Sequence, residues 1–340
     1  MTDTDFHAQL AHYRDLVRPL MLDSVPDSEA SPYLYGPARD FLDQHGKGLR
    51  PALCIATCSA FGGNEKAALP TAAALELLHN ALLVHDDIED ESLERRGEPT
   101  LHVKYGVPIA LNIGDAMNAL VLRVLMKNLA PLGPRLSWQV VEEFNHLLLQ
   151  SLEGQALELG WIRDNACDVR ESDYLTMILK KTCWYSFIHP CRLGALLAGR
   201  RDLERFHAFA YLAGAAFQIQ DDVLNLSSRN GAYGKESCGD LWEGKRTLIL
   251  ARAFETMPGA ERMRFQRVLS KPRSRRVERD VDWMRGVLEQ NGSIRYAQQV
   301  AAELAKAARA EFDRAFAAAP DGPDKRFLRQ FADFMVQRIA

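Results

Sequence analysis

The stretch from Leu75 to Arg96 reads LELLHNALLVHDDIEDESLERR and joins an apolar helical face to a cluster of acidic residues. The apolar positions recur at helical spacing and predict one buried face: Leu75, Leu78 and Leu82. Three carboxylates follow at i,i+3 and i,i+4 spacing: Asp86, Asp87 and Asp90. They therefore share one side of the same helix, where they repel one another.

The direction of this helix adds a second unfavourable interaction. We expect the helix to begin near Pro70 and Thr71, so the carboxylates lie at its C-terminal end, where the helix dipole favours cations. A hard divalent cation such as Mg2+ relieves both effects, because it binds carboxylates and completes its octahedron with phosphate oxygens. Arg95 and Arg96 follow and are placed to hold a phosphate. The alternative for an isolated acidic triplet is a solvated helix end.

Residues 217–226, FQIQDDVLNL, repeat this arrangement behind another apolar run. Asp221, Asp222 and Asn225 have the spacing of the first triplet. Two carboxylate-bearing helices that face each other across a cavity can hold several metal ions, as in the metal sites of helix bundles. Two solvated helix ends are a poor explanation for such a repetition, which predicts a shared metal site.

The composition is that of one globular domain over residues 1–340. Of the residues, 47% are hydrophobic and 26% are charged, and a formal net charge of -3 shows no basic excess for nucleic acid. We expect the start, MTDTDFHAQL, to be neither a secretory signal nor a transit peptide, and no uninterrupted apolar run is long enough for a bilayer. We expect no stable membrane anchor. The six cysteines lack CxxC and framework spacing, so we interpret them as reduced core residues of a cytoplasmic protein.

Three further segments carry cations that could meet an anion. Residues 45–51, HGKGLRP, form a glycine-punctuated turn with Lys47 and Arg50, although such a turn can also simply connect two helices. Lys181 and Thr182 stand inside an apolar helix, where a lysine needs a partner or reaches for the surface.

The third segment, residues 227–247, is rich in Gly and Ser and carries Lys235 and Lys245. Its GDLWEGK sequence matches part of a P-loop, but Arg246 stands where Ser or Thr is needed and no strand precedes it. We therefore expect a basic loop that closes over a bound diphosphate.

Apolar residues at helical spacing predict helices over residues 5–21, 109–130, 136–162, 171–199 and 293–318 and over the C-terminal segment FLRQFADFMVQRIA. The basic run 271–279 is interpreted as a solvated loop and helix start. No internal repeat and no run of alternating β-branched residues is present. We predict an all-α fold of about ten to a dozen helices around a central cavity.

Taken in order, these motifs resemble those of the trans-isoprenyl diphosphate synthases, the polyprenyl synthetase family, over nearly the whole chain. The family's two aspartate-rich motifs resemble the DDIED sequence at residues 86–90, with Arg95-Arg96-Gly97 at matching spacing, and the FQIQDD sequence at residues 217–222. The family's GGKRxRP turn resembles residues 45–51, its K-T pair resembles Lys181-Thr182, and its two later lysines match Lys235 and Lys245.

Three positions depart from the family pattern. His45 replaces the first glycine of the basic turn, and Gly48 replaces a cation. Asn225 replaces the last aspartate of the second motif, a variant associated with geranylgeranyl diphosphate synthases. The amide can still bind a metal through its carbonyl oxygen but adds no charge.

The resemblance implies a role for each of these residues. Mg2+, in three ions and with Mn2+ as a substitute, is held between the acidic faces by six residues: Asp86, Asp87, Asp90, Asp221, Asp222 and Asn225. The ions bind the diphosphate of an allylic substrate, and three cations add to the clamp: Arg95, Lys181 and Lys235. Four residues hold isopentenyl diphosphate: Lys47, Arg50, Arg96 and His102. Thr182 and Gln218 direct oxygen dipoles at the allylic cation, and family members are usually homodimers.

Three alternatives differ in what they require. A class I terpene cyclase on the same fold needs no isopentenyl site, so Lys47, Arg50 and His102 argue against it. A non-catalytic subunit of a prenyl synthase would lose metal ligands, whereas five of the six acidic positions remain. A helical metal-binding scaffold does not explain the cations beside both acidic motifs.

Product length depends on the residues before the first aspartate. The growing chain is expected to run along the helix that carries Asp86, past Leu82 and Ala81 and then Leu78 and Leu75. Short-chain members of the family place a large aromatic residue four or five positions before that aspartate, whereas Ala81 leaves the path open. We expect a product longer than farnesyl, with geranylgeranyl diphosphate (C20) as the best match.

Overall fold

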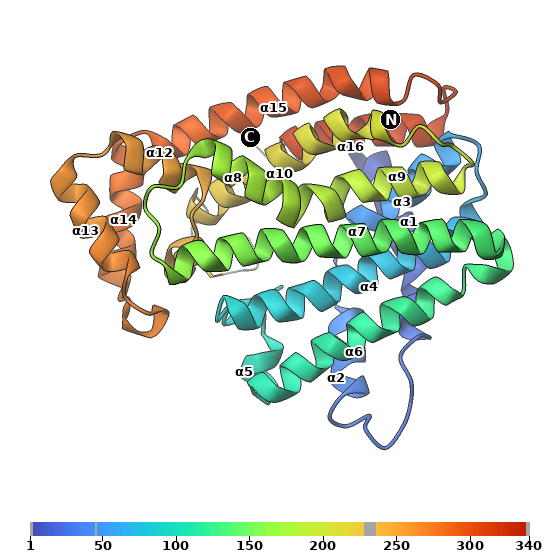
Figure 1. Cartoon of the computed structure of the whole chain (residues 1–340), viewed down its shortest axis with the longest axis horizontal. Helices are drawn as coiled ribbons and strands as arrows, with labels where there is room; N and C mark the ends of the chain where they lie inside the picture. The colour runs from blue at the N-terminus through green and yellow to red at the C-terminus, as the bar shows by residue number, and fades with distance from the viewer. Residues whose placement is uncertain (1–2, 45, 228–235, 338–340) are drawn as a thin grey trace.

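The computed structural model describes residues 3–44, 46–227 and 236–337, most of them in helices (Figure 1). The first part of the chain forms α1 (Asp3–Leu22), α2 (Tyr35–Asp43), α3 (Leu49–Ala60) and α4 (Glu65–Glu89). An antiparallel hairpin of β1 (Glu94–Arg95) and β2 (Glu98–Pro99) leads to α5 (Leu101–Tyr105), α6 (Val107–Met126) and α7 (Leu129–Arg163). The expected single helix over residues 109–130 is therefore wrong at its end, because the chain turns at Lys127 and Asn128.

The second part begins with α8 (Glu171–Ile178), a π-helix η1 (Leu179–Ile188) and α9 (His189–Leu197), which follow without a break. The 3-10 turn η2 (Glu204–Phe206) precedes α10 (His207–Ser227). The remaining elements are α11 (Gly239–Glu243), α12 (Leu248–Thr256), α13 (Gly259–Leu269), η3 (Arg273–Arg275), α14 (Glu278–Gln290), α15 (Ser293–Ala315) and α16 (Pro323–Gln337). The all-α prediction is confirmed, and within the described residues short helices such as α5 and α11 bring the number above the dozen expected.

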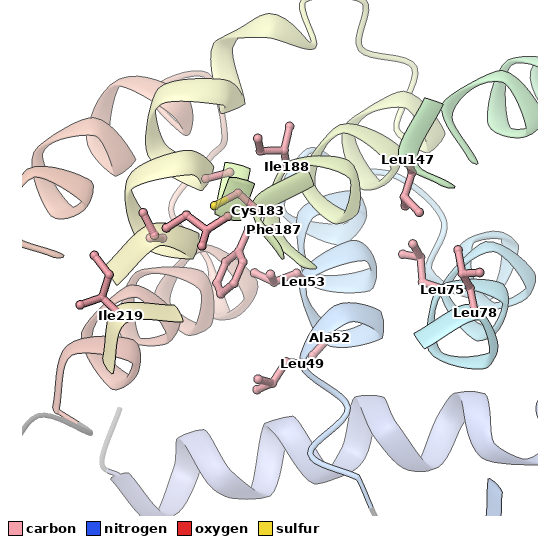
Figure 2. Packing of buried hydrophobic residues seen from close by; sticks show 14 of the residues in the cluster. Leu49, Ala52, Leu53, Leu75, Leu78, Leu147, Cys183, Phe187, Ile188 and Ile219 are labelled. Carbon is pink, nitrogen blue, oxygen red and sulfur yellow. The ribbon is translucent and has the colours of Figure 1, made fainter. Parts of the chain in front are cut away.

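The long helices lie roughly alongside one another (Figure 1). α4 packs against α6 and α7, and α10 packs against α15 along the opposite side of the molecule. α3 contacts α4, α9 and η1 in the interior. Figure 2 shows Leu53 of α3 beside Phe187 of η1, and Leu75 of α4 near Leu147 of α7. These apolar side chains form one core that holds the long helices in fixed positions.

Helix α4 begins earlier than the sequence suggested. Asn64 is its N-cap, and the Asn64 side chain accepts a hydrogen bond from the Lys66 backbone at 3.0 Å. The expected start near Pro70 is wrong, because Pro70 lies inside the helix. The C-terminal end is as predicted, with Asp86 and Asp87 in the last turn and Asp90 as the C-cap.

Two glycines let neighbouring helices approach η1 closely. A Cβ added at Gly154 of α7 would lie 2.3 Å from the Lys181 backbone nitrogen. A Cβ added at Gly214 of α10 would lie 2.9 Å from Cys183 Sγ. The π-helix η1 therefore packs closely between α7 and α10. Side chains of these two helices contact Lys181 and Thr182 directly.

The cysteines agree with the sequence interpretation, since all six are unpaired and buried. By length and composition alone, two helices in the described part of the chain could cross a membrane: α4, with 72% of its apolar window buried inside the fold, and α6, with 44% buried. The core position of α4 explains its apolar character.

Candidate active site

The first acidic cluster lies where the end of α4 meets the hairpin. The hairpin turns through Arg96 and Gly97, which have φ values of 55° and 78°, and so brings Arg95 back over α4. Arg95 Nε donates to both oxygens of Asp87, at 2.7 and 2.8 Å, and Arg95 NH2 lies 3.5 Å from Asp86 Oδ2. Asp87 is 1% exposed, whereas Asp86 is half-buried. Arg95 therefore neutralises Asp87 within the fold.

Lys181 of η1 reaches the same cluster. Its Nζ lies 3.3 Å from Asp86 Oδ1 and also pairs with Glu158 of α7. Burial alone would lower the pKa of Lys181, but Glu158 and then Asp86 outweigh it and raise the pKa. The lysine stays charged inside an apolar helix because it has two carboxylate partners, so it does not need to reach the surface.

Asp90 faces a lysine that follows α11. Lys245 Nζ lies 2.7 Å from Asp90 Oδ2 and 2.8 Å from Glu243 Oε2. Burial raises the pKa of Asp90 to about 7, while Lys245 acts in the opposite direction. Among the residues that the structure describes, Asp90 Oδ1 is buried and has no hydrogen-bond partner. A buried carboxylate oxygen without a donor is a favourable position for a cation.

The second acidic cluster lies on α10, in a chain of hydrogen bonds. Thr182 Oγ1 donates to Gln218 Oε1 at 2.9 Å, and Gln218 Nε2 donates to Asp222 Oδ1 at 2.9 Å. The other oxygen, Asp222 Oδ2, accepts from the Tyr174 hydroxyl at 2.6 Å. Burial raises the pKa of Asp222 to about 7, and the Tyr174 and Gln218 hydrogen bonds lower it in part.

The second acidic cluster borders a cavity of about 50 Å³, and two lysines of the cavity wall connect it to the first cluster. The cavity walls include Asp221 and Asp222 of the second cluster together with Lys181 and Lys245. These two lysines contact Asp86 and Asp90 of the first cluster. The fold thus brings the two acidic segments to opposite sides of the same lysine pair, although 135 positions separate Asp86 from Asp221 in the sequence.

Asn225 also makes a hydrogen bond with the backbone of a neighbouring helix. Its side-chain oxygen accepts a hydrogen bond from the Asp240 backbone at 3.1 Å, and the residue is 6% exposed. This hydrogen bond with Asn225 holds the start of α11, the short helix that precedes Lys245, in place against α10. The Asn225 carbonyl oxygen keeps one lone pair for a metal ion.

Arg50 lies in the first turn of α3, and Arg96 of the hairpin lies beside Gln44 and Gly46. Arg50 NH2 donates to the Tyr185 hydroxyl at 2.9 Å and to Ser186 Oγ at 2.8 Å. Arg50 Nε is buried and has no acceptor within the described part of the chain. Arg96 NH1 donates to the Gln44 carbonyl at 3.0 Å. The structure thus holds two guanidinium groups near the basic turn, and one of them has a donor still available for an anion.

The other residues predicted to hold isopentenyl diphosphate are more exposed. Lys47 is exposed, and His102 Nδ1 lies 3.1 Å from Thr100 Oγ1. Gly48 has a φ of 67°, and a Cβ there would lie 2.7 Å from Arg14 Cβ, so this position has no room for the family's cation. Lys235 and His45 lie outside the described residues.

The interpretation of the basic run 271–279 as solvated is wrong for Arg276. Arg276 is 7% exposed and donates to the backbone carbonyls of Leu241, Trp242 and Leu269. Burial and the neighbouring Arg246 lower the pKa of Arg276 to about 10.

Arg246 is also buried and donates to the Gly244 and Ala166 carbonyls and to Asn165 Oδ1. Gly244 has a φ of 76°, and a Cβ there would lie 2.8 Å from Arg276 NH2, so the two guanidiniums pack directly against this glycine. Together the two arginines fix the backbone on either side of Lys245.

Sequence reasoning assigned no role to three residues that complete the site: Tyr174, Glu158 and Glu243. Their partners lie 48, 23 and 2 positions away. Only the closest pair, Glu243 and Lys245, has a visible signal in the sequence, an acidic residue beside a motif lysine. The other two contacts depend on how α7, α8 and α10 pack.

The donor set is that of a hard divalent cation. Every predicted ligand offers oxygen, from five carboxylates and one amide. In the described residues, no three His, Cys, Asp or Glu side chains converge closely enough to hold an ion without help. An ion bound here would complete its coordination with phosphate oxygens and water, as Mg2+ commonly does. The residues present fit a metal that binds together with a diphosphate.

Comparison with known proteins gives one consistent match. The family model described as polyprenyl synthetase matches residues 31–284. A geranylgeranyl diphosphate synthase from Methanosarcina mazei is 33% identical over 307 residues, which is 90% of each chain. A geranylfarnesyl diphosphate synthase from Natronomonas pharaonis is 28% identical over 99% of each chain. The crystal structure of a polyprenyl synthase from Caulobacter crescentus, complexed with calcium and isoprenyl diphosphate, has a TM-score of 0.86 at 27% identity and covers 99% of this chain and 98% of that one.

Proposed function

This chain belongs to the polyprenyl synthetase family, and on that premise we propose that its two acidic clusters together bind the diphosphate of an allylic substrate through divalent cations. The chain is an isoprenyl diphosphate synthase, a trans-prenyltransferase whose family condenses isopentenyl diphosphate with an allylic diphosphate. The family is generally dependent on divalent metal. We propose three Mg2+ ions, the number that the family resemblance implies, and the all-oxygen donor set supports the choice of a hard divalent cation.

Bound divalent cations supply Lewis-acid neutralisation of the diphosphate leaving group. Lys181 and Lys245 border the same cavity and add positive charge from fixed positions, so the charge that develops on the departing diphosphate meets cations already in place. Asp86 would hold an ion from the α4 side, and Asp221 and Asp222 from the α10 side. The carboxylates act as ligands, and none of them needs to transfer a proton.

When the carbon–oxygen bond to the diphosphate breaks, an allylic carbocation remains. Thr182 and Gln218 line the cavity and can direct oxygen dipoles towards this cation. Arg50, Arg96, Lys47 and His102 would hold isopentenyl diphosphate so that its double bond attacks, and the released diphosphate accepts the proton lost at the end. Orientation and exclusion of water decide whether the cation is alkylated or quenched.

The observation that carries this proposal is the meeting of Asp86, Lys181 and Glu158 beside the cavity that Asp221 and Asp222 line. The experiment supplies the purified protein with farnesyl diphosphate and Mg2+, with and without isopentenyl diphosphate. We expect a lengthened diphosphate only when isopentenyl diphosphate is present, and no turnover in EDTA. A cyclic hydrocarbon formed from the allylic substrate alone would show that the site is that of a terpene cyclase.

We propose geranylgeranyl diphosphate as the product, because no aromatic side chain stands four or five positions before Asp86, where short-chain members of the family place one. Ala81 is 0% exposed on α4, and Leu82 is half-buried. Ala81→Phe is expected to fill the path and shift the product from C20 towards farnesyl diphosphate, at an overpacking cost of about 1–3 kcal/mol. Chain lengths are measured by mass spectrometry of the dephosphorylated products.

Ala301→Phe is the control for overpacking, because Ala301 of α15 is equally buried and lies on another helix. It should lower stability without changing product length. An unchanged C20 product in Ala81→Phe would show that Ala81 does not face the growing chain.

Two features support a homodimer in the cytoplasm. Large apolar side chains on the exposed sides of α6 and α7 could form a subunit interface: Leu122, Met126, Trp138 and Leu149, each more than half exposed. The six buried, unpaired thiols fit a reducing compartment.

A further inference from the structure

Tyr174 of α8 touches the candidate metal site without belonging to either acidic motif. The residue is 1% exposed, and its hydroxyl donates to Asp222 Oδ2 at 2.6 Å. Tyr174 also lines the cavity that contains Lys181 and Lys245. A tyrosine buried to this extent normally places its hydroxyl against a partner, and here the partner is a predicted metal ligand.

The hydrogen bond from Tyr174 completes a chain that immobilises Asp222. Gln218 donates to the other carboxylate oxygen at 2.9 Å and is itself held by Thr182 at 2.9 Å. The carboxylate therefore has a donor on each oxygen, from α8 on one side and from the adjacent turn of α10 on the other. A carboxylate held at both oxygens cannot rotate about its Cβ–Cγ bond without breaking one of these bonds.

A carboxylate has about four lone-pair directions, of which these two donors use one on each oxygen. The remaining directions stay available for a cation. Groups that hydrogen-bond to a metal ligand fix its orientation, and removing one typically weakens metal binding about 10- to 100-fold. Tyr174 makes a hydrogen bond of this kind to Asp222.

We propose that Tyr174 is a positioning residue, whose hydroxyl fixes the Asp222 carboxylate in the orientation that binds a divalent cation. This inference rests on the proposed function, because it assumes that Asp222 is a ligand. It adds that α8, which carries neither acidic motif, orients a carboxylate of the second acidic cluster.

Tyr174→Phe removes the hydroxyl and keeps the ring, so the core packing around α8 is retained. Tyr296→Phe is the matched control, because its hydroxyl also donates to a carboxylate, Glu171 Oε2 at 2.5 Å, but lies on α15 away from the cavity. Mn2+ binding is measured by electron paramagnetic resonance in the presence of inorganic diphosphate. The Mg2+ concentration that gives half-maximal activity is measured in parallel.

We expect Tyr174→Phe to weaken Mn2+ binding and to raise the half-maximal Mg2+ concentration by about 10- to 100-fold, with activity recovered at saturating Mg2+. Tyr296→Phe should match the wild type in both measurements. A purely structural role for Tyr174 would lower the melting temperature and leave the metal dependence unchanged, which would overturn the inference.

If Tyr174→Phe does not fold, Tyr174→Met also lacks the hydroxyl, and its flexible side chain fills the space. The same metal titrations then apply with the same outcomes. Failure of the proposed function is distinguishable, because in that case the wild type itself would show no Mn2+ binding with diphosphate and no lengthening of farnesyl diphosphate. Normal wild-type elongation together with unchanged metal affinity in both Tyr174 variants would reject the inference alone.

Discussion

Replacing Asp86 with alanine is expected to lower kcat about 100-fold or more, because one preorganised electrostatic contact to the leaving group is lost. Asp221→Ala should have an effect of similar size from the opposite acidic cluster. In each variant the remaining carboxylates of the cluster still repel one another, and in Asp86→Ala Lys181 loses one of its two carboxylate partners. Steady-state kinetics at saturating Mg2+ and both diphosphates provide the measurement.

Asp164→Ala is the matched control, because Asp164 lies at the surface and pairs with the adjacent Arg163. Its kcat should equal that of the wild type. Circular dichroism checks that each variant folds. Unchanged turnover in a folded Asp86→Ala or Asp221→Ala protein would contradict the metal-binding role of that cluster.

The second large effect is expected at Arg50. Hydrogen bonds to a charged group typically contribute about 1.5–3 kcal/mol, so Arg50→Ala should raise the KM for isopentenyl diphosphate about 10- to 100-fold. The KM for the allylic substrate should change much less, since Arg50 lies at the start of α3 and does not line the cavity that Asp221 and Asp222 border. Initial rates with each substrate varied in turn separate the two constants.

Arg163→Ala serves as the control here, because the Arg163 side chain is 79% exposed and its partner is the neighbouring Asp164. Equal increases in both KM values for Arg50→Ala would indicate a general loss of structure, since Arg50 also supports Tyr185 and Ser186. A KM for isopentenyl diphosphate equal to that of the wild type would remove Arg50 from the site.

The parts of the fold that could be predicted from the sequence depend on local pattern. The apolar stripe before Asp86 predicted the buried face of α4, and Leu75 and Leu78 are 1% and 2% exposed. The repeated acidic spacing predicted that α4 and α10 border one site, and the described contacts of Lys181 and Lys245 join them. Period and spacing within one helix are enough for such predictions.

Other features depend on contacts between distant segments and left no local signal. The π-helix forms where Gly154 and Gly214 let α7 and α10 press against η1, which no pattern within residues 179–188 reveals. The run around Arg276 has the composition of a solvated loop, but the Arg276 guanidinium is buried and donates hydrogen bonds to the carbonyls of Leu241 and Trp242. Pro70 looked like a helix start, and Asn64 caps α4 instead.

Candidate site residues divide in the same way. Motif spacing alone predicts Asp86, Asp90, Asp221 and Asp222 as metal ligands. The electrostatic partners could not be identified from spacing, because Glu158 meets Lys181 only where α7 crosses η1. Tyr174 meets Asp222 only where α8 packs against α10. Backbone packing decides which hydrogen bonds a ligand receives, and a single sequence does not show it.

The central claim is that both acidic clusters bind one allylic diphosphate through divalent metal. Calorimetric titration with farnesyl thiolodiphosphate, an allylic analogue that ionises poorly, tests it most directly. We predict tight binding in Mg2+, and binding weaker by about tenfold or more in EDTA and in both Asp86→Ala and Asp221→Ala. Equal affinity with and without Mg2+, or in both variants and the wild type, would contradict the claim.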